Sequence, residues 1–204
     1  MVAFALGTGL ATAALATDTP PAWQAFSQAW AQSGAFSARI TAYERRGTRA
    51  ETIVVDYNYQ SPAHATVRVV QGPNRGAILV WDGGATLQAH LGGGLLYGLS
   101  KSIPLHDPSV ESPRGSSLDE LSYASILRHG DTTPGTSSEQ AGETIGGVST
   151  DAVSLTPADP AADGGLTREV VEIATTTHLP LRIRGYEGTT LVRQIDFANV
   201  ALKR

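Results

Sequence analysis

The chain of 204 residues contains no cysteine. It therefore cannot form a disulfide framework, a thiolate metal site or a thiol nucleophile, and it offers no cysteine for the anchor of a bacterial lipoprotein. Positive charge is also sparse, because 15 Lys and Arg residues are outnumbered by 19 Asp and Glu residues. The basic residues lie scattered along the chain, so a basic surface for nucleic acid is not expected.

Long hydrophobic runs are missing apart from residues 2–16, VAFALGTGLATAALA, which are small or apolar and uncharged. This run is too short to span a bilayer, so no integral membrane span is expected. Ala14-Leu15-Ala16 matches the small-x-small pattern of a signal-peptidase site. We therefore predict a secretory signal at residues 1–16, followed by one domain over residues 17–204 in the periplasm. The alternative is an ordinary apolar first helix.

The motifs of common enzyme classes are missing as well. GVSTD at residues 147–151 lacks the second glycine of a nucleophile elbow, and GGG at residues 92–94 lacks the spacing of a dinucleotide-binding loop. The five histidines are not spaced as metal ligands, and the pair His106-Asp107 is typical of a solvated loop. We predict a protein without enzymatic activity, cofactor or metal. A hydrolase would require His106 or His90 beside a serine or carboxylate in a cleft.

What the sequence does contain is a set of strand-length apolar runs between Glu51 and Leu91, with turn residues between them. In ETIVVDYNYQ the odd-numbered positions from 53 to 59 are apolar or aromatic and alternate with mostly polar residues, the period of a half-buried strand. The same alternation occurs in HATVRVV. DGG at residues 82–84 predicts a tight hairpin into TLQAHL. This region is therefore predicted to form an antiparallel meander.

Two helices are predicted outside the meander. In the first, Trp23, Phe26 and Trp30 fall at i, i+3 and i+7 and form one apolar stripe. We expect Thr19 to cap this helix, which should end near Gly34.

The second helix is expected over residues 117–130. Ser117 and Glu120 have the spacing of a capping box, and Gly130 is expected to end the helix.

The remaining segments are mostly strands. A first strand begins at Phe36, residues 131–142 are interpreted as a polar loop, and residues 143–157 as two short strands or one interrupted strand. The last third is predicted to form long strands with a break at residues 178–180. The predicted fold class is α+β, with a strongly curved antiparallel sheet, an incomplete β-barrel, covered by two amphipathic helices.

The order of these elements resembles the LolA-like proteins of the bacterial periplasm. Residues 82–87, DGGATL, are similar to the aspartate-glycine hairpin of that family, and residues 179–181, LPL, to its proline turn. Gln60 stands where the lipoprotein-sorting carriers of the family usually place a basic residue, and residues 114–130 are more similar to the uncharacterised relatives. The resemblance implies a half-barrel, open along one side, whose concave apolar face accepts acyl chains.

The binding hypothesis is therefore an exported carrier or sensor for a lipid acyl chain or another elongated apolar ligand, with roles in lipid or lipoprotein transport. Its partners would be lipid or lipoprotein acyl chains, together with an envelope protein as a docking partner. The predicted ligand contacts face inward from the strands or the first helix, namely Trp23, Phe26, Trp30, Ile53, Val55, Tyr57, Tyr59, Val67, Val69, Leu79 and Trp81.

Each of these residues has an alternative interpretation, because it could equally fill a dry core. In that case the domain would be a non-enzymatic interaction or regulatory domain outside the cytoplasm. Such a domain could recruit a partner protein by strand addition to an exposed sheet edge. The volume and lining of the space between helix and sheet distinguish the two hypotheses.

Overall fold

The computed structural model describes residues 19–90 and 100–203. The predicted signal at residues 1–16 and the glycine run at residues 92–94 lie outside these residues. The described part contains two α-helices, α1 (Pro21–Ala31) and α2 (Tyr123–Thr132), and a short 3-10 helix, η2 (Leu118–Leu121). No helix in it is long and apolar enough to cross a membrane.

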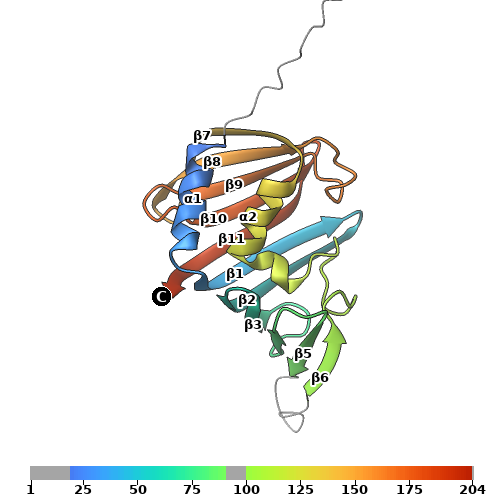
Figure 1. The fold of residues 1–204 in the computed structure, drawn as a ribbon. Coiled ribbons are helices and arrows are strands. Elements are labelled where there is room, and N and C mark those ends of the chain that lie inside the picture. The colour runs from blue at the N-terminus through green and yellow to red at the C-terminus, as the bar shows by residue number, and fades with distance from the viewer. Residues whose placement is uncertain (1–18, 91–99, 204) are drawn as a thin grey trace, which may run out of the picture.

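Eleven strands form one antiparallel sheet in the order β6-β5-β4-β3-β2-β1-β11-β10-β9-β8-β7 (Figure 1). Strands β1 to β6 pair in sequence order, as do strands β7 to β11, and the pairing of β1 with β11 joins these two halves of the chain. The strands are β1 (Ala35–Arg46), β2 (Arg49–Gln60), β3 (His64–Gln71), β4 (Ile78–Trp81), β5 (Thr86–His90), β6 (Ser100–Pro104), β7 (Gly135–Ile145), β8 (Val148–Pro157), β9 (Arg168–Ala174), β10 (Pro180–Glu187) and β11 (Thr190–Lys203).

The predicted meander is confirmed as strands β2 to β5. Val55, Tyr57 and Tyr59 are buried on one face of β2, as the alternation of its sequence requires. The predicted hairpin joins β4 to β5, and Gly83 in it has a φ of 80°. A Cβ at this position would also lie 2.7 Å from the Cβ of Ala63, so glycine is needed for both reasons.

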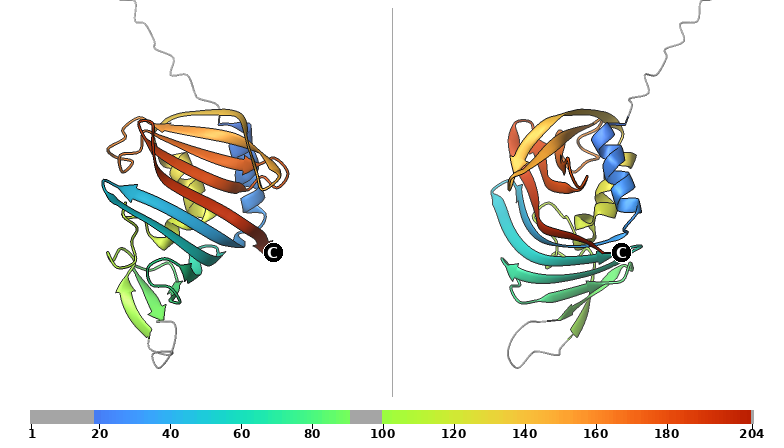
Figure 2. Two further views of the ribbon diagram at one scale, coloured as in Figure 1. Left: turned by 180° about the vertical axis from the view of Figure 1, so that it is seen from behind. Right: turned by 90° about the vertical axis from the view of Figure 1, so that its left-hand side faces the viewer.

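The sheet is strongly curved, and α1 and α2 both lie on its concave side (Figure 2). Aromatic rings fill the space beneath them. Phe36 of β1 stacks on Tyr123 of α2 with ring centroids 4.2 Å apart, and Trp30 of α1 meets Phe36 edge to face at 5.9 Å. Phe197 of β11 also packs against Tyr123. This cluster joins both helices to the centre of the sheet.

The ends of both helices differ from the prediction. Thr19 does not cap α1, because Pro20 occupies the N-cap position and provides no side-chain cap. The second helical segment is divided at Ser122, whose hydroxyl accepts a hydrogen bond from the N–H of Ser125 and starts α2 anew. Gly130 does not end α2, which continues to Thr132.

The interpretation of residues 131–142 as a loop was wrong. Residues from Gly135 onward form β7, which pairs with β8 over most of its length. β7 is an edge strand, and most of its side chains are exposed, so its sequence lacks the apolar alternation that marks the other strands. Residues 143–157 contribute the end of β7 and the whole of β8, joined by a turn at Gly146-Gly147.

The fold is α+β, as predicted, and its described sheet is open, with β6 and β7 at its two edges.

Candidate functional site

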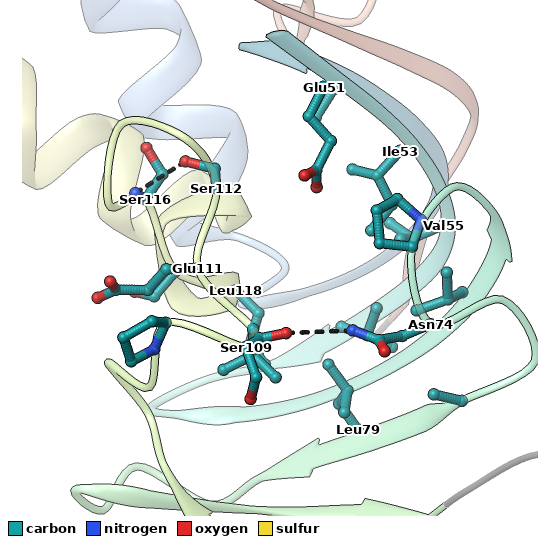
Figure 3. Close-up of a pocket in the computed structure, with 18 of the residues that line it drawn as sticks. Glu51, Ile53, Val55, Asn74, Leu79, Ser109, Glu111, Ser112, Ser116 and Leu118 are labelled. Carbon is teal, nitrogen blue, oxygen red and sulfur yellow. Dashed lines mark hydrogen bonds between the residues drawn. The ribbon is translucent and has the colours of Figure 1, made fainter. Parts of the chain in front are cut away.

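A cavity of about 620 Å³ lies on the concave side of strands β1 to β6 (Figure 3). We call it the main cavity. Its opposite wall is formed by η2 and by the segment that leads to it from β6. We call residues 105–117 of that segment the strap. A void of this size is not a packing defect, because close-packed protein interiors rarely leave spaces larger than a few water molecules.

The lining of the main cavity is mostly apolar. Ile53 and Val55 of β2, Val67 and Val69 of β3, and Leu79 of β4 face it from the sheet. Further apolar side chains complete the lining from β5, β6, the strap and η2, namely Ala89, Ile103, Val110, Leu118 and Leu121. Such a surface favours an apolar guest, since water in contact with it makes few hydrogen bonds.

Hydrogen bonds hold the strap in place at Ser109 and at Arg114. The side-chain amide of Asn74, in the turn between β3 and β4, donates a hydrogen bond to the carbonyl of Ser109 at 3.1 Å (Figure 3). The side chain of Arg114 is 8% exposed. Its guanidinium donates hydrogen bonds to the carbonyls of Arg45 and Gly164 and to the carboxylate of Glu187. The strap therefore connects the β1–β2 hairpin to the second half of the chain.

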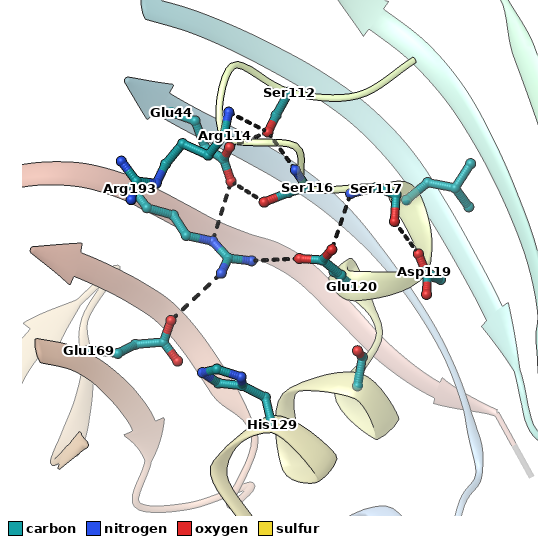
Figure 4. Close-up of polar contacts among 12 residues, drawn as sticks. Glu44, Ser112, Arg114, Ser116, Ser117, Asp119, Glu120, His129, Glu169 and Arg193 are labelled. Atoms are coloured by element: carbon teal, nitrogen blue, oxygen red, sulfur yellow. Dashed lines mark hydrogen bonds and ion pairs between the residues drawn. The ribbon is translucent and has the colours of Figure 1, made fainter. Parts of the chain in front are cut away.

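Glu44 of β1 holds the strap from beneath (Figure 4). Its carboxylate, which is buried, accepts hydrogen bonds from the hydroxyls of Ser112 and Ser116 and lies 3.4 Å from Nε of Arg193. Hydrogen bonds between charged and neutral groups are stronger than neutral ones, so this contact fixes the strap to the sheet.

Arg193 of β11 lies among three carboxylates (Figure 4). Besides Glu44, it faces Glu169 at 3.7 Å and Glu120 at 3.9 Å. Burial opposes the charge of Arg193, but the carboxylates of Glu169, Glu44 and Glu120 outweigh it, so the pKa of the guanidinium is raised.

On the neighbouring acids, burial shifts the pKa upward, because it disfavours the charged form of a carboxyl group. It raises the pKa of Glu120 and of Asp163, in each case against the attraction of nearby positive charge. Asp163 lies 3.5 Å from Nε2 of His129. These acids and His129 line a smaller cavity of about 320 Å³ on the far side of Arg193.

Five of the predicted ligand contacts, Ile53, Val55, Val67, Val69 and Leu79, line the main cavity together. The three predicted on the first helix lie elsewhere. Trp23, Phe26 and Trp30 are buried in the aromatic core beneath α1, and Nε1 of Trp23 donates to Asp131 at 2.9 Å.

The other three predicted contacts also lie outside the lining. Tyr57 is fully buried, and its hydroxyl donates to the carbonyl of Leu118. The Tyr59 hydroxyl donates to the carbonyl of Pro62, and Nε1 of Trp81 donates to the carbonyl of Gly84. Burial raises the pKa of both tyrosines, which is consistent with hydroxyls that stay protonated donors.

Sequence reasoning missed the strap and the charged side chains of the cavity. Glu44, Glu51, Arg49 and Lys101 line the cavity from the strands, and Glu111 lines it from the strap. On the concave face, Glu44 follows the apolar positions of β1, and Arg49 and Glu51 precede those of β2. These charged positions were the available signal. The strap itself has no periodic pattern, because contacts distant in sequence hold it.

The part of the chain that the structure describes contains no group of His, Cys, Asp and Glu arranged to hold a metal ion. His106 lies beside a carboxylate, with Nδ1 3.2 Å from Glu111, but its side chain is 63% exposed. In the described residues this histidine makes no hydrogen bond to a serine hydroxyl.

No protein-family model and no curated protein sequence matches the chain. Solved structures do match its fold. LprF from Mycobacterium bovis has a TM-score of 0.54 at 16% identity, with 89% of this chain and 93% of that chain covered. The lipoprotein LppX of Mycobacterium tuberculosis has a TM-score of 0.51 at 14% identity, with 89% and 96% covered. The fold is LolA-like.

A LolA superfamily protein from Nitrosomonas europaea also matches, at 10% identity over 91% of this chain and 95% of that chain. Its TM-score is 0.38, so we base no argument on it. At these identities the likeness concerns the fold, and the function must be argued from the site.

Proposed function

We propose that the chain is an exported carrier or sensor that binds the acyl chain of a lipid or lipoprotein in the main cavity. The observation that carries this proposal is the cavity itself, with about 620 Å³ of space and a mostly apolar lining. Binding pockets for small molecules typically measure roughly 300–1,000 Å³. The LolA-like fold supports the same interpretation, because the resemblance to that family implies an acyl-binding concave face.

Affinity would come from apolar surface that leaves water when the guest enters. Each Å² contributes about 25 cal/mol. The five aliphatic side chains of β2, β3 and β4 supply a wall without hydrogen-bonding groups. Glu44, Glu51 and Arg49, which lie together at one end of the cavity, would then face the polar end of the guest.

A cavity-filling substitution tests this proposal. Ala89→Phe places a ring in the main cavity from β5, whereas Ala198→Phe places the same ring on the exposed surface of β11. Nile red, a neutral dye whose fluorescence rises in apolar surroundings, should bind the natural sequence and the Ala198 variant alike. The Ala89 variant should lose at least tenfold in affinity while keeping its melting temperature. Equal binding by all three proteins would contradict the proposal.

Export and carriage are further parts of the proposal and need the protein from its native envelope. Mass spectrometry of the purified protein should give a mature N-terminus near Thr17, and extraction should release lipid. A chain that retains residues 1–16 would contradict export, and an extract without lipid would argue against a carrier.

The alternative function, an interaction domain outside the cytoplasm, requires that side chains fill the core. An aromatic core packs beneath α1 and α2, next to the smaller cavity beside Arg193, whereas the larger and mostly apolar main cavity lies over β1 to β6. We therefore favour ligand binding over that alternative.

A further inference from the structure

The charged side chains of the main cavity are not spread evenly over its wall. Arg49, Glu51, Ile53 and Val55 follow one another on the cavity side of β2, so the wall changes from charged to aliphatic along this strand. Glu44 of β1 is paired in register with Glu51. One end of the cavity thus carries Glu44, Glu51 and Arg49, whereas the wall beyond it on β2 is aliphatic.

The two glutamates at the polar end differ in their partners. The carboxylate of Glu44 is already bound by Ser112, Ser116 and Arg193. Glu51 has a single ion pair among the described residues, to Nη2 of Arg49 at 3.7 Å, and this distance is too long for a good hydrogen bond.

The setting of Glu51 favours a ligand contact. Figure 3 shows its carboxylate pointing from β2 into the cavity. Its side chain is 24% exposed, whereas that of Arg49 is 65% exposed, so solvent weakens the ion pair between them. Like charges directly opposite each other on two strands are unfavourable, so a positive group between Glu44 and Glu51 would relieve their repulsion.

We infer that the ligand of the main cavity is an amphiphile whose head group carries a protonated amine. Glu51 accepts a hydrogen bond from this amine, while the chain lies along Ile53, Val55 and the walls of β3 and β4. This inference rests on the proposed function and adds the class of head group. A free fatty acid would bring a third carboxylate to Glu44 and Glu51, so it is disfavoured in this orientation.

A ligand bound in the opposite orientation would depend on a different residue. Lys101 lines the cavity from β6, in register with Ala89, and could attract a carboxylate. A fatty acid bound there would depend on Lys101 and not on Glu51. The two orientations therefore predict different mutational effects.

The test compares three amphiphiles of equal chain length, dodecylamine, dodecanoate and monododecanoylglycerol, as competitors of Nile red at neutral pH. Dodecylamine should compete at about tenfold lower concentration than dodecanoate, since a hydrogen bond to a charged group is worth roughly this factor. In Glu51→Gln the preference should fall to near unity, with the neutral competitor unchanged.

Asp56→Asn is the matched control. Asp56 lies on the other face of β2, where it pairs with Arg39, so its removal should leave the preference intact. Melting temperatures of both variants show that the fold is retained.

Each other outcome overturns the inference in a distinguishable way. Equal competition by all three amphiphiles, or an equal effect of Glu51→Gln on all three, removes the amine contact and leaves acyl binding in place. A preference for dodecanoate that is lost in Lys101→Gln reverses the orientation. Failure of Nile red and all three amphiphiles to bind removes the proposed function as well.

Discussion

Burial raises the pKa of Glu120, which lies on η2 between the strap and Arg193. A raised folded-state pKa means that the folded protein holds this proton more tightly than the unfolded chain does. The contribution to stability is therefore fully present below the ordinary pKa of about 4.3. It is lost as the pH rises through the raised value.

Glu120→Gln removes this titration and keeps an oxygen that can accept the hydrogen bond from the N–H of Ser117. The free energy of unfolding of the variant, relative to the natural sequence, should therefore increase as the pH rises above about 4.3. Denaturant unfolding at a series of pH values measures this difference. A difference that decreases with pH would contradict the assignment.

Asp107 provides a control of opposite sign. The hydroxyl and N–H of Ser109 lower the pKa of its carboxyl, so its contribution is present above the ordinary pKa and is lost as the pH falls. The same series on Asp107→Asn should show a relative stability that falls with rising pH.

The contact between α1 and α2 depends on Gly130. A Cβ at this position would lie 2.3 Å from Cζ2 of Trp23, so the helices could not keep their separation. Helix propensity alone would make Gly130→Ala stabilising by about 1 kcal/mol. Overpacking costs about 1–3 kcal/mol and should outweigh it, giving a net loss of about 1 kcal/mol.

Denaturant unfolding of Gly130→Ala measures the outcome, with Gly84→Ala as the control. A Cβ on Gly84 would meet nothing within 4 Å, and this glycine is not in the left-handed region. The control should change stability by less than about 0.5 kcal/mol. A stabilised Gly130 variant would show that the helices are not in close contact.

The strap should control how fast a ligand enters and leaves. Asn74→Gly removes the side-chain hydrogen bond to the carbonyl of Ser109 and suits the φ of 59° at this position, so it frees that part of the strap without backbone strain. Because both groups are exposed, stability should change by less than about 1 kcal/mol. Dissociation of Nile red, followed by stopped flow, should become several-fold faster.

Asn58→Ala is the control for this prediction. Asn58 accepts a hydrogen bond from Lys203 on the surface, away from the strap. Nile red should dissociate from the Asn58 variant as fast as from the natural sequence. Unchanged rates in the Asn74 variant would mean that the ligand passes elsewhere.

The elements that the sequence predicted correctly are those whose pattern is local. Alternation on β2 and β3 placed Val55, Val67 and Val69 on the inner face, and the DGG turn placed the hairpin. The same alternation could not show that Val55 lines the cavity while Tyr57 is buried in the core. This difference arises because α2 and η2 cover only part of the inner face. β7 was missed because an edge strand with polar side chains on both faces has no pattern to detect.

The molecule combines two halves of different character in one sheet. The half from β7 to β11 carries α1 and α2 on its concave side, and the aromatic cluster of Phe36, Tyr123 and Phe197 continues beneath them to β1. The half from β1 to β6 has the strap above it and retains the main cavity. The pairing of β1 with β11 makes the two halves continuous. The half with the aromatic core can therefore support a half that keeps a cavity for a guest.

The sequence could not reveal this division of the molecule. Inward-facing apolar residues look alike whether they contact a helix, as Tyr59 contacts Trp30, or border a cavity, as Leu79 does. The difference arises from where η2 and the strap return across the sheet. That return depends on Glu44, Arg114 and Arg193, whose contacts join residues far apart in the chain.

The central claim is that an acyl chain occupies the main cavity. The most direct measurement is an isotope-filtered NMR experiment on the labelled protein with unlabelled dodecylamine, which detects contacts between the alkyl chain and protein methyl groups. An alkyl chain in the main cavity should give contacts to Val67, Val69 and Leu79, and none to Val171 or Ile195, which are buried in the half that carries α1 and α2. Contacts to Val171 and Ile195, or an alkyl chain that touches no methyl group of the cavity, would contradict this expectation.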